Sequence, residues 1–267
     1  MINVKKMDGS LQPYDESKLR NSLAKAGADV QAIAMIISVV NKILYEGIET
    51  KKLYDLAFKE LKTRKPAIAP RYDLKNAILK LGYGGFAFEK FIARILEKQG
   101  YKTILNQIVQ GKLITHEVDI TAVNETEKLM VECKHHASPW HGCGIQTPLY
   151  VYARFLELKE QYSSPMLVTN TKFSEQVTTY SNGVGMRLMG WNYPRENSVS
   201  YNIERFKLYP ITIMPGLERD KIEQLLNNNV ILIRDIVDKK HIVKNILAIS
   251  GHRMDEMVIQ AEALISK

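Results

Sequence analysis

Two apolar segments of the chain each carry an acidic residue that a buried β-strand normally excludes. The segments are His116–Ile120 and Leu129–Lys134, and the polar run 124–127 between them is typical of a hairpin turn. A turn centred between residues 125 and 126 places Asp119 directly opposite Glu132. Because like charges that face each other across a ladder are destabilising, this hairpin needs a compensating partner. Lys134 points to the same side as Glu132, since strand side chains alternate.

A bound divalent cation would turn the conflict between these two acids into a binding site. Carboxylate oxygens suit Mg²⁺ or Mn²⁺. A lysine beside such an ion can orient an attacking water or stabilise negative charge on a phosphate. The pattern therefore indicates a metal site at Asp119 and Glu132, with Lys134 as its catalytic neighbour.

A further acid lies on the edge of an apolar helix face upstream of the hairpin. The spacing predicts a helix over residues 86–99, with Glu89 beside its buried face. An acid in that position is unusual without a partner. Glu89 is either another metal-site carboxylate or the partner of a lysine.

Bulk properties favour an intracellular, cytoplasmic protein with a polyanionic partner. The net charge is +8 and only two cysteines are present, so no disulfide framework is implied. No apolar run approaches the ~20 residues that span a bilayer, and the N-terminus has no signal-peptide pattern. The basic excess lies mainly in residues 1–81, with 15 Lys and Arg against 9 Asp and Glu. A basic surface suits a nucleic acid but does not identify one.

The pattern divides the chain into an α-rich segment 1–81, an α/β segment 82–210 and a helical segment 211–267. In the first segment we expect a strand over 3–6, a turn at 8–10, and helices over about 15–25, 30–44, 50–61 and 72–81, the third capped by Thr50. A flexible hinge is expected at Gly82–Gly85. Strands that alternate with helices in the second segment predict a mixed sheet with at least one parallel pair.

Three short motifs mark the first segment. They are Val4-Lys5-Lys6-x-Asp8-Gly9, Tyr14-Asp15-x-x-Lys18-Leu19-x-x-Ser22-Leu23 and Gly47-Ile48-x-Thr50. With these motifs, residues 2–80 resemble the ATP-cone family, a small α-rich domain that binds nucleotides and regulates. The resemblance implies ATP or dATP as a regulatory ligand at Val4, Lys5, Lys6, Gln12, Asp15, Lys18 and Thr50. Met7 stands where the family often has a second basic residue.

A second set of motifs runs through residues 82–195. They are Phe88-Glu89, Gly111…Glu117-Val118-Asp119-Ile120, Val131-Glu132-Cys133-Lys134, Gln146-x-x-x-Tyr150, Val168-Thr169-Asn170-Thr171-x-Phe173 and Gly190-Trp191-x-Tyr193-Pro194. In combination they resemble the PD-(D/E)xK nuclease superfamily and its Mrr-like restriction endonuclease branch. The resemblance implies that Asp119 and Glu132 hold a metal, that Lys134 is catalytic and that Gln146 is an auxiliary polar residue. Val118 stands where the superfamily motif has proline.

Other chemistry-bearing residues have competing interpretations. His135, His136, His141 and Cys143 form a cluster that is either a zinc site or a polar loop beside the active site, and their spacing fits no known zinc motif. Cys133 alternates away from its charged neighbours and is expected to be a small core residue. Residues 211–267 weakly resemble paired helix-hairpin-helix modules, which hold nucleic-acid phosphates. A packing or dimerisation module is the alternative.

The two resemblances together imply a Mg²⁺-dependent endonuclease that hydrolyses DNA, of the restriction or defence type, under control by ATP or dATP. No Walker A loop is present, so ATP-driven translocation is not expected. DNA and a nucleotide are the expected partners, and the protein is expected to be a homo-oligomer. The alternatives are an inactive, nucleotide-responsive DNA-binding regulator on the same folds and a nucleotide sensor that touches no nucleic acid.

Overall fold

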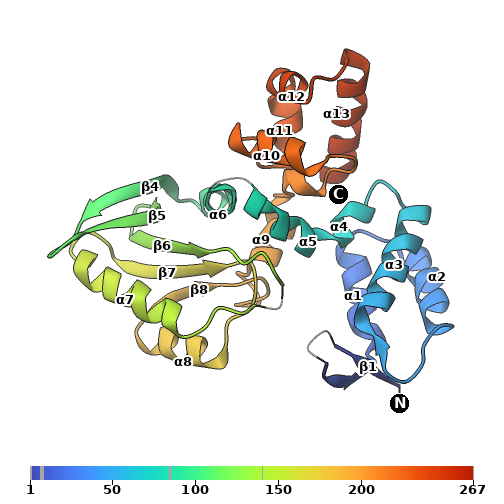
Figure 1. Ribbon diagram of the computed structural model, residues 1–267, viewed down its shortest axis with the longest axis horizontal. Coiled ribbons are helices and arrows are strands. Elements are labelled where there is room, and N and C mark those ends of the chain that lie inside the picture. Colours follow the sequence, from blue (N-terminus) through green and yellow to red (C-terminus); the bar gives the residue numbers. More distant parts are fainter. Residues whose placement is uncertain (1, 7–8, 84–85, 140, 267) are drawn as a thin grey trace.

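A five-stranded mixed sheet and two groups of helices meet around two short helices, α5 (Leu74–Leu79) and α9 (Val199–Phe206), near the centre of the molecule (Figure 1). The computed structural model describes residues 2–6, 9–83, 86–139 and 141–266. None of the described helices is long and apolar enough to cross a membrane.

The N-terminal group combines a three-stranded sheet with three longer helices. The sheet has the order β2 (Leu11–Pro13), β1 (Asn3–Lys5), β3 (Ile48–Glu49), and the helices are α1 (Glu16–Lys25), α2 (Val30–Asn41) and α3 (Thr50–Arg64). The Asp15 side chain caps α1 by accepting a hydrogen bond from the Ser17 amide, and Asp29 caps α2 through the Ala32 amide. The helices bury a hydrophobic cluster of their own, so this group has a separate core.

Two expectations for this segment were wrong in detail. Thr50 is the first residue of α3 rather than its cap, and its hydroxyl donates to the Lys5 carbonyl across the small sheet at 3.3 Å. The predicted helix over 72–81 is observed as α5 (Leu74–Leu79) followed by the 3₁₀ helix η1 (Lys80–Tyr83), and a separate short helix, α4 (Ala69–Tyr72), precedes them. The Tyr54 hydroxyl bonds to the Tyr72 carbonyl and the Asp73 side chain between α4 and α5. Of the predicted turn and hinge, Asp8, Gly84 and Gly85 lie outside the described residues.

The central sheet has strands in chain order, with antiparallel pairing at one side and parallel pairing at the other. The strands are β4 (Lys102–Gln110), β5 (Thr115–Val123), β6 (Lys128–Lys134), β7 (Ser164–Thr169) and β8 (Arg187–Met189). The β4–β5 and β5–β6 pairs are antiparallel, and the β6–β7 and β7–β8 pairs are parallel. The predicted mixed α/β fold with a parallel pair is therefore confirmed.

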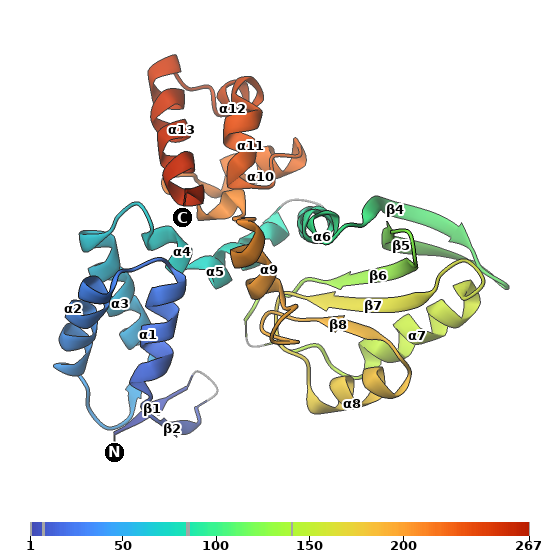
Figure 2. The ribbon, with the colours of Figure 1, turned by 180° about the vertical axis from the view of Figure 1, so that it is seen from behind.

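Helices cover both faces of this sheet (Figures 1 and 2). One face packs against α6 (Ala87–Lys98), which buries Phe88, Phe91 and Ile92. The other face packs against α7 (Gln146–Leu158) and α8 (Glu175–Gly183) through a separate cluster. Strands β5 and β6 therefore lie between α6 on one face and α7 on the other, and their side chains alternate between the two faces.

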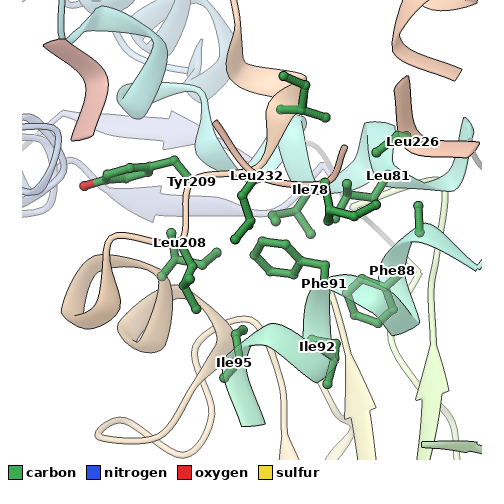
Figure 3. Close-up of a cluster of buried hydrophobic side chains, with 14 of the residues drawn as sticks. Ile78, Leu81, Phe88, Phe91, Ile92, Ile95, Leu208, Tyr209, Leu226 and Leu232 are labelled. Carbon is green, nitrogen blue, oxygen red and sulfur yellow. The ribbon is translucent and has the colours of Figure 1, made fainter. Parts of the chain in front are cut away.

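The C-terminal helices share one hydrophobic core with the α6 face of the sheet. They are α9 (Val199–Phe206), η2 (Ile211–Ile213), α10 (Arg219–Asn227), α11 (Ile233–Asp238), α12 (Lys240–Leu247) and α13 (Gly251–Ile265). Figure 3 shows Leu232 from this part of the chain beside Phe91 of α6 and Ile78 of α5, and Leu226 beside Leu81 of η1. The core is therefore continuous across the expected boundary at residues 210 and 211.

A buried arginine joins the N-terminal group to the C-terminal helices. Arg71 of α4 is only 4% exposed. Its Nε donates to the carbonyl of Leu264 in α13 at 2.9 Å, its Nη2 donates to the same oxygen, and its guanidinium lies 4.8 Å from the Tyr209 ring centre. Thr212 adds a hydrogen bond of 2.7 Å to the Ala77 carbonyl in α5. The contacts fix α4 and α5 against the C-terminal helices.

Candidate active site

The predicted hairpin has the predicted register. The β5–β6 ladder pairs Ile120 with Val131 and Val123 with Lys128, which centres the turn between residues 125 and 126. The ladder ends at the Ile120–Val131 pair, and Asp119 and Glu132 are the next residues on the two strands. Asp119 Oδ2 accepts a hydrogen bond of 2.7 Å from the Cys133 amide, so its carboxylate reaches across to the partner strand. The two acids therefore lie together where β5 and β6 part.

The Glu132 carboxylate is buried and held by two side chains from α7. Glu132 is 9% exposed. Tyr150 donates its hydroxyl proton to Oε1, and Arg154 Nη1 lies 2.6 Å from Oε2. The same Arg154 nitrogen donates to the Glu117 carbonyl at 3.0 Å. Both oxygens of Glu132 are thus engaged, one by a neutral donor and one by a cation.

Burial and neighbouring acids raise the pKa values of two other carboxyl groups here. Burial, followed by the Glu132 charge, raises the pKa of Asp119 to about 7. Burial also raises the pKa of Glu89 on α6, with added contributions from the charges of Glu132 and Glu117. Among the described residues, neither Asp119 nor Glu89 forms an ion pair. The structure therefore contains no lysine partner for Glu89 among the described residues, and the interpretation of Glu89 as a lysine partner is not supported.

Lys134 stands at the end of β6 with its side chain exposed. Its carbonyl accepts a hydrogen bond of 2.8 Å from the Thr169 hydroxyl, and Asn170 bonds to both the amide and the carbonyl of His136. These contacts extend the β6–β7 pairing by side chains and fix the strand end. In the described part of the chain, the Lys134 ammonium forms no ion pair, so it is available to a ligand.

Gln146 is the first residue of α7 and is exposed. No hydrogen bond in the described part of the chain joins it to the acids. Arg154 was missed by the sequence interpretation, although it follows Gln146 and Tyr150 in steps of four residues. That spacing places the three on one helix face and would have identified it.

The chemistry of these donors fits a hard divalent cation, because Asp119 and Glu89 carry carboxyl groups whose pKa values respond to the Glu132 charge and which have no cationic partner among the described residues. Within the described ranges no group of three or more His, Cys, Asp or Glu side chains is close enough to hold an ion, and Glu132 is paired with Arg154 instead.

The zinc interpretation of His135, His136, His141 and Cys143 has no support among the described residues either, because they form no such group. His135 Nε2 instead contacts the Ile78 carbonyl at 3.2 Å, and Cys143 is buried. Cys133 is buried in the core, as expected.

The residues expected to bind a nucleotide gather around the small N-terminal sheet. Val4 pairs with Gln12 on β2 and with Ile48 on β3. Lys5 pairs with Leu11 and Glu49, and Thr50 bonds to the Lys5 carbonyl. The Lys6 amide donates a hydrogen bond of 2.8 Å to the Ser10 carbonyl, just before β2. The sheet thus brings Val4, Lys5, Gln12 and Thr50 together.

The other two expected nucleotide residues lie at the start of α1, which begins three residues after β2 ends. Asp15 caps the helix, and the Lys18 ammonium lies 4.0 Å from its carboxylate. Both side chains are largely exposed, so the pair contributes little to stability. The Lys18 charge is therefore available for a phosphate.

The raised pKa of Asp119 makes stability depend on pH. The folded pKa of about 7 exceeds the ordinary unfolded value of about 3.9, so the folded protein holds an extra proton between these values and stability falls as pH rises through that window. Without metal, we expect the wild-type Tm to fall by roughly 5 °C more than that of Asp119→Asn between pH 4.5 and 8, measured by differential scanning fluorimetry. Mg²⁺ should restore the wild-type Tm at pH 8 selectively. Parallel curves for the two proteins would contradict the assignment.

Comparisons with known proteins agree with this geometry. Family models match residues 2–80 (ATP cone domain), 82–191 (restriction endonuclease) and 209–265 (AF1548-like, C-terminal). An uncharacterized protein of Archaeoglobus fulgidus is 34% identical over 175 residues, which are 65% of this chain and 99% of the relative. A crystal structure of the protein of unknown function AF1548 is similar with a TM-score of 0.60 and 33% identity, over 68% of this chain and 98% of the other.

A mixed sheet between helices, with acids where two strands part, defines a protein of the restriction-endonuclease-like class. An ATP-cone domain precedes that fold, and the combination indicates a nuclease under nucleotide control. The chain belongs to the AF1548-like family, with the ATP-cone at residues 2–80 and the family's helical C-terminal domain at residues 209–265.

Proposed function

We propose that this protein is a divalent-metal-dependent endonuclease that hydrolyses phosphodiester bonds of DNA, of the restriction or defence type. The observation that carries the proposal is the position of Asp119 and Glu132 at the gap between β5 and β6, with Glu89 of α6 near enough for the Glu132 charge to raise its pKa, within the segment that matches a restriction endonuclease model. Acids that raise one another's pKa in a site are typical of functional sites.

Each residue has a definite role in this proposal. Asp119, Glu132 and Glu89 hold Mg²⁺ or Mn²⁺, which supplies Lewis-acid stabilisation of charge on the phosphate. Lys134 is exposed, two residues after Glu132 on β6, and stabilises negative charge on the phosphate or orients the attacking water. Gln146, at the first turn of α7, is an auxiliary polar contact.

The partners follow from the same features. The net charge of +8 favours a polyanionic substrate such as DNA, and cleavage of two strands favours a homo-oligomer. The ATP-cone binds ATP or dATP through Val4, Lys5, Lys6, Gln12, Asp15, Lys18 and Thr50. Because Arg71 and Thr212 fix the N-terminal group against the C-terminal helices, a change at the nucleotide site has a physical route to the nuclease core.

The test is a cleavage assay with methylated and unmethylated plasmid DNA, with Mg²⁺ or Mn²⁺ against EDTA, and with ATP, dATP or neither. We expect metal-dependent loss of supercoiled plasmid that changes with the nucleotide. Intact plasmid under every metal and nucleotide condition would reject the nuclease.

Nucleotide binding has a test of its own. Lys18→Ala should weaken ATP or dATP binding about tenfold, measured by isothermal titration calorimetry, because it removes a charge that pairs with phosphate. Lys59→Ala is the matched control, since this exposed lysine lies on α3 away from the small sheet and should leave affinity unchanged. Equal losses in the two variants would show a general charge effect and contradict the site.

A second candidate function is a catalytically inactive, nucleotide-responsive DNA-binding regulator. The Glu132–Arg154 ion pair favours it, because a carboxylate neutralised by arginine can be a structural remnant of a metal site. This candidate predicts salt-sensitive DNA retention in gel shifts without cleavage in Mg²⁺ or Mn²⁺.

A further inference from the structure

Arg154 is the one side-chain cation that directly pairs with the acids at the strand gap, within the described part of the chain. Its Nη1 lies 2.6 Å from Glu132 Oε2 and 3.0 Å from the Glu117 carbonyl oxygen, and its guanidinium lies 5.4 Å from the Tyr150 ring centre. The side chain is only 23% exposed. The guanidinium is therefore held in place by several contacts at once.

The Arg154 charge offsets the repulsion between Glu132 and the acids near it. Asp119 and Glu89 both experience the Glu132 charge, and Glu117 adds a further acid on the neighbouring strand. Lys134 is on the same strand as Glu132 but forms no ion pair with it among the described residues. Buried charges persist when they are paired, so Arg154 makes the cluster tolerable without a metal.

A divalent cation bound between Asp119 and Glu132 would draw on the negative charge of the same carboxylate that Arg154 engages through Oε2. Two cations that share one carboxylate in a partly buried site repel each other. Tyr150 is different, since its neutral hydroxyl engages the other oxygen and opposes no incoming charge.

We propose that Arg154 is an intrinsic competitor of the divalent cation, which occupies Glu132 in the metal-free protein and must leave it when the ion binds. This inference rests on the metal dependence proposed above and adds the residue that sets the cation affinity. Arg154 acts through Glu132 and is a positioning residue.

The test measures Mn²⁺ binding by isothermal titration calorimetry in the absence of DNA. Arg154→Gln keeps a hydrogen-bond donor but removes the charge, and it should bind Mn²⁺ about tenfold more tightly than wild type. Tyr150→Phe removes the neutral donor on the same carboxylate and should bind no more tightly. Arg187→Ala breaks a comparable ion pair with Glu127, at 2.5 Å near the hairpin turn, and should leave the affinity unchanged.

A double variant completes the test. In a Glu132→Gln background, adding Arg154→Gln should change Mn²⁺ affinity by less than about twofold, because the contested carboxylate is gone. Thermal unfolding of each variant checks folding. If Arg154→Gln is unstable, Arg154→Lys is measured as well, and because it keeps the charge its Mn²⁺ affinity should stay near that of wild type.

Unchanged or weaker Mn²⁺ binding by Arg154→Gln overturns the inference. If the wild type still cleaves DNA with Mn²⁺ in that case, the nuclease stands and only the competition fails. If neither the wild type nor Arg154→Gln binds Mn²⁺, the metal-dependent function and the inference fail together. Tight binding that appears only in Arg154→Gln supports the competition.

Discussion

Lys134→Ala should lower the rate of metal-dependent DNA cleavage by about 10²–10³-fold, the usual effect of removing one preorganised group that stabilises transition-state charge. The loss should appear in the single-turnover cleavage rate of plasmid DNA. Because the Lys134 side chain is exposed and forms no ion pair among the described residues, the Tm should stay within about 1 °C of wild type.

Two controls separate catalysis from general charge. Lys102→Ala removes another exposed lysine, at the start of the edge strand β4, and should cleave at nearly the wild-type rate. Lys134→Ala should also bind Mn²⁺ as wild type does, since lysine is not a metal ligand. A cleavage rate within about threefold of wild type would remove Lys134 from the mechanism.

Arg71→Ala should give the largest loss of stability among the changes considered. The variant deletes two hydrogen bonds from a buried cation to the Leu264 carbonyl and leaves this oxygen in the last turn of α13 without its donor. It also removes the stacking on Tyr209. We expect a cost of about 3 kcal/mol and a Tm lower by roughly 5–10 °C, measured by circular dichroism.

The same variant should weaken the effect of ATP or dATP on cleavage, because it loosens the contact between the N-terminal group and the C-terminal helices. Arg64→Ala is the control, since it breaks a more exposed ion pair with Glu60 within α3 and should lower the Tm by little. A wild-type Tm for Arg71→Ala would show that the junction contributes no stability.

The parts of the site that follow from alternation along a strand could be predicted from sequence. Glu132 and Lys134 are two residues apart, and the polar turn determined the register that brings Asp119 of β5 close to Glu132. The roles of Arg154 and Tyr150 could not be derived in the same way, because they depend on how α7 crosses the sheet. The roles of Asp119, Glu132, Lys134 and Gln146 remain proposals.

In the fold, too, elements with local sequence signals were predicted, whereas elements that depend on contacts between distant residues were not. Helix α1, capped by Asp15, begins close to the start expected at about residue 15. Strand β4 was not predicted, because its exposed and partly buried residues alternate without a strong apolar signal at the edge of the sheet. Helix α4 was not predicted, and the Tyr54 hydroxyl that bonds to Asp73 between α4 and α5 lies 19 residues away in sequence.

The shared core of the sheet and the C-terminal helices bears on how this protein can be divided. Phe91 of α6 and Leu232 after α10 belong to one cluster, whereas α1, α2 and α3 enclose another. Residues beyond 208 thus complete the nuclease interior instead of forming an appendage. Shortening the chain there would leave an aggregation-prone surface. A fragment or fusion that contains this nuclease fold should therefore keep the C-terminal helices with it.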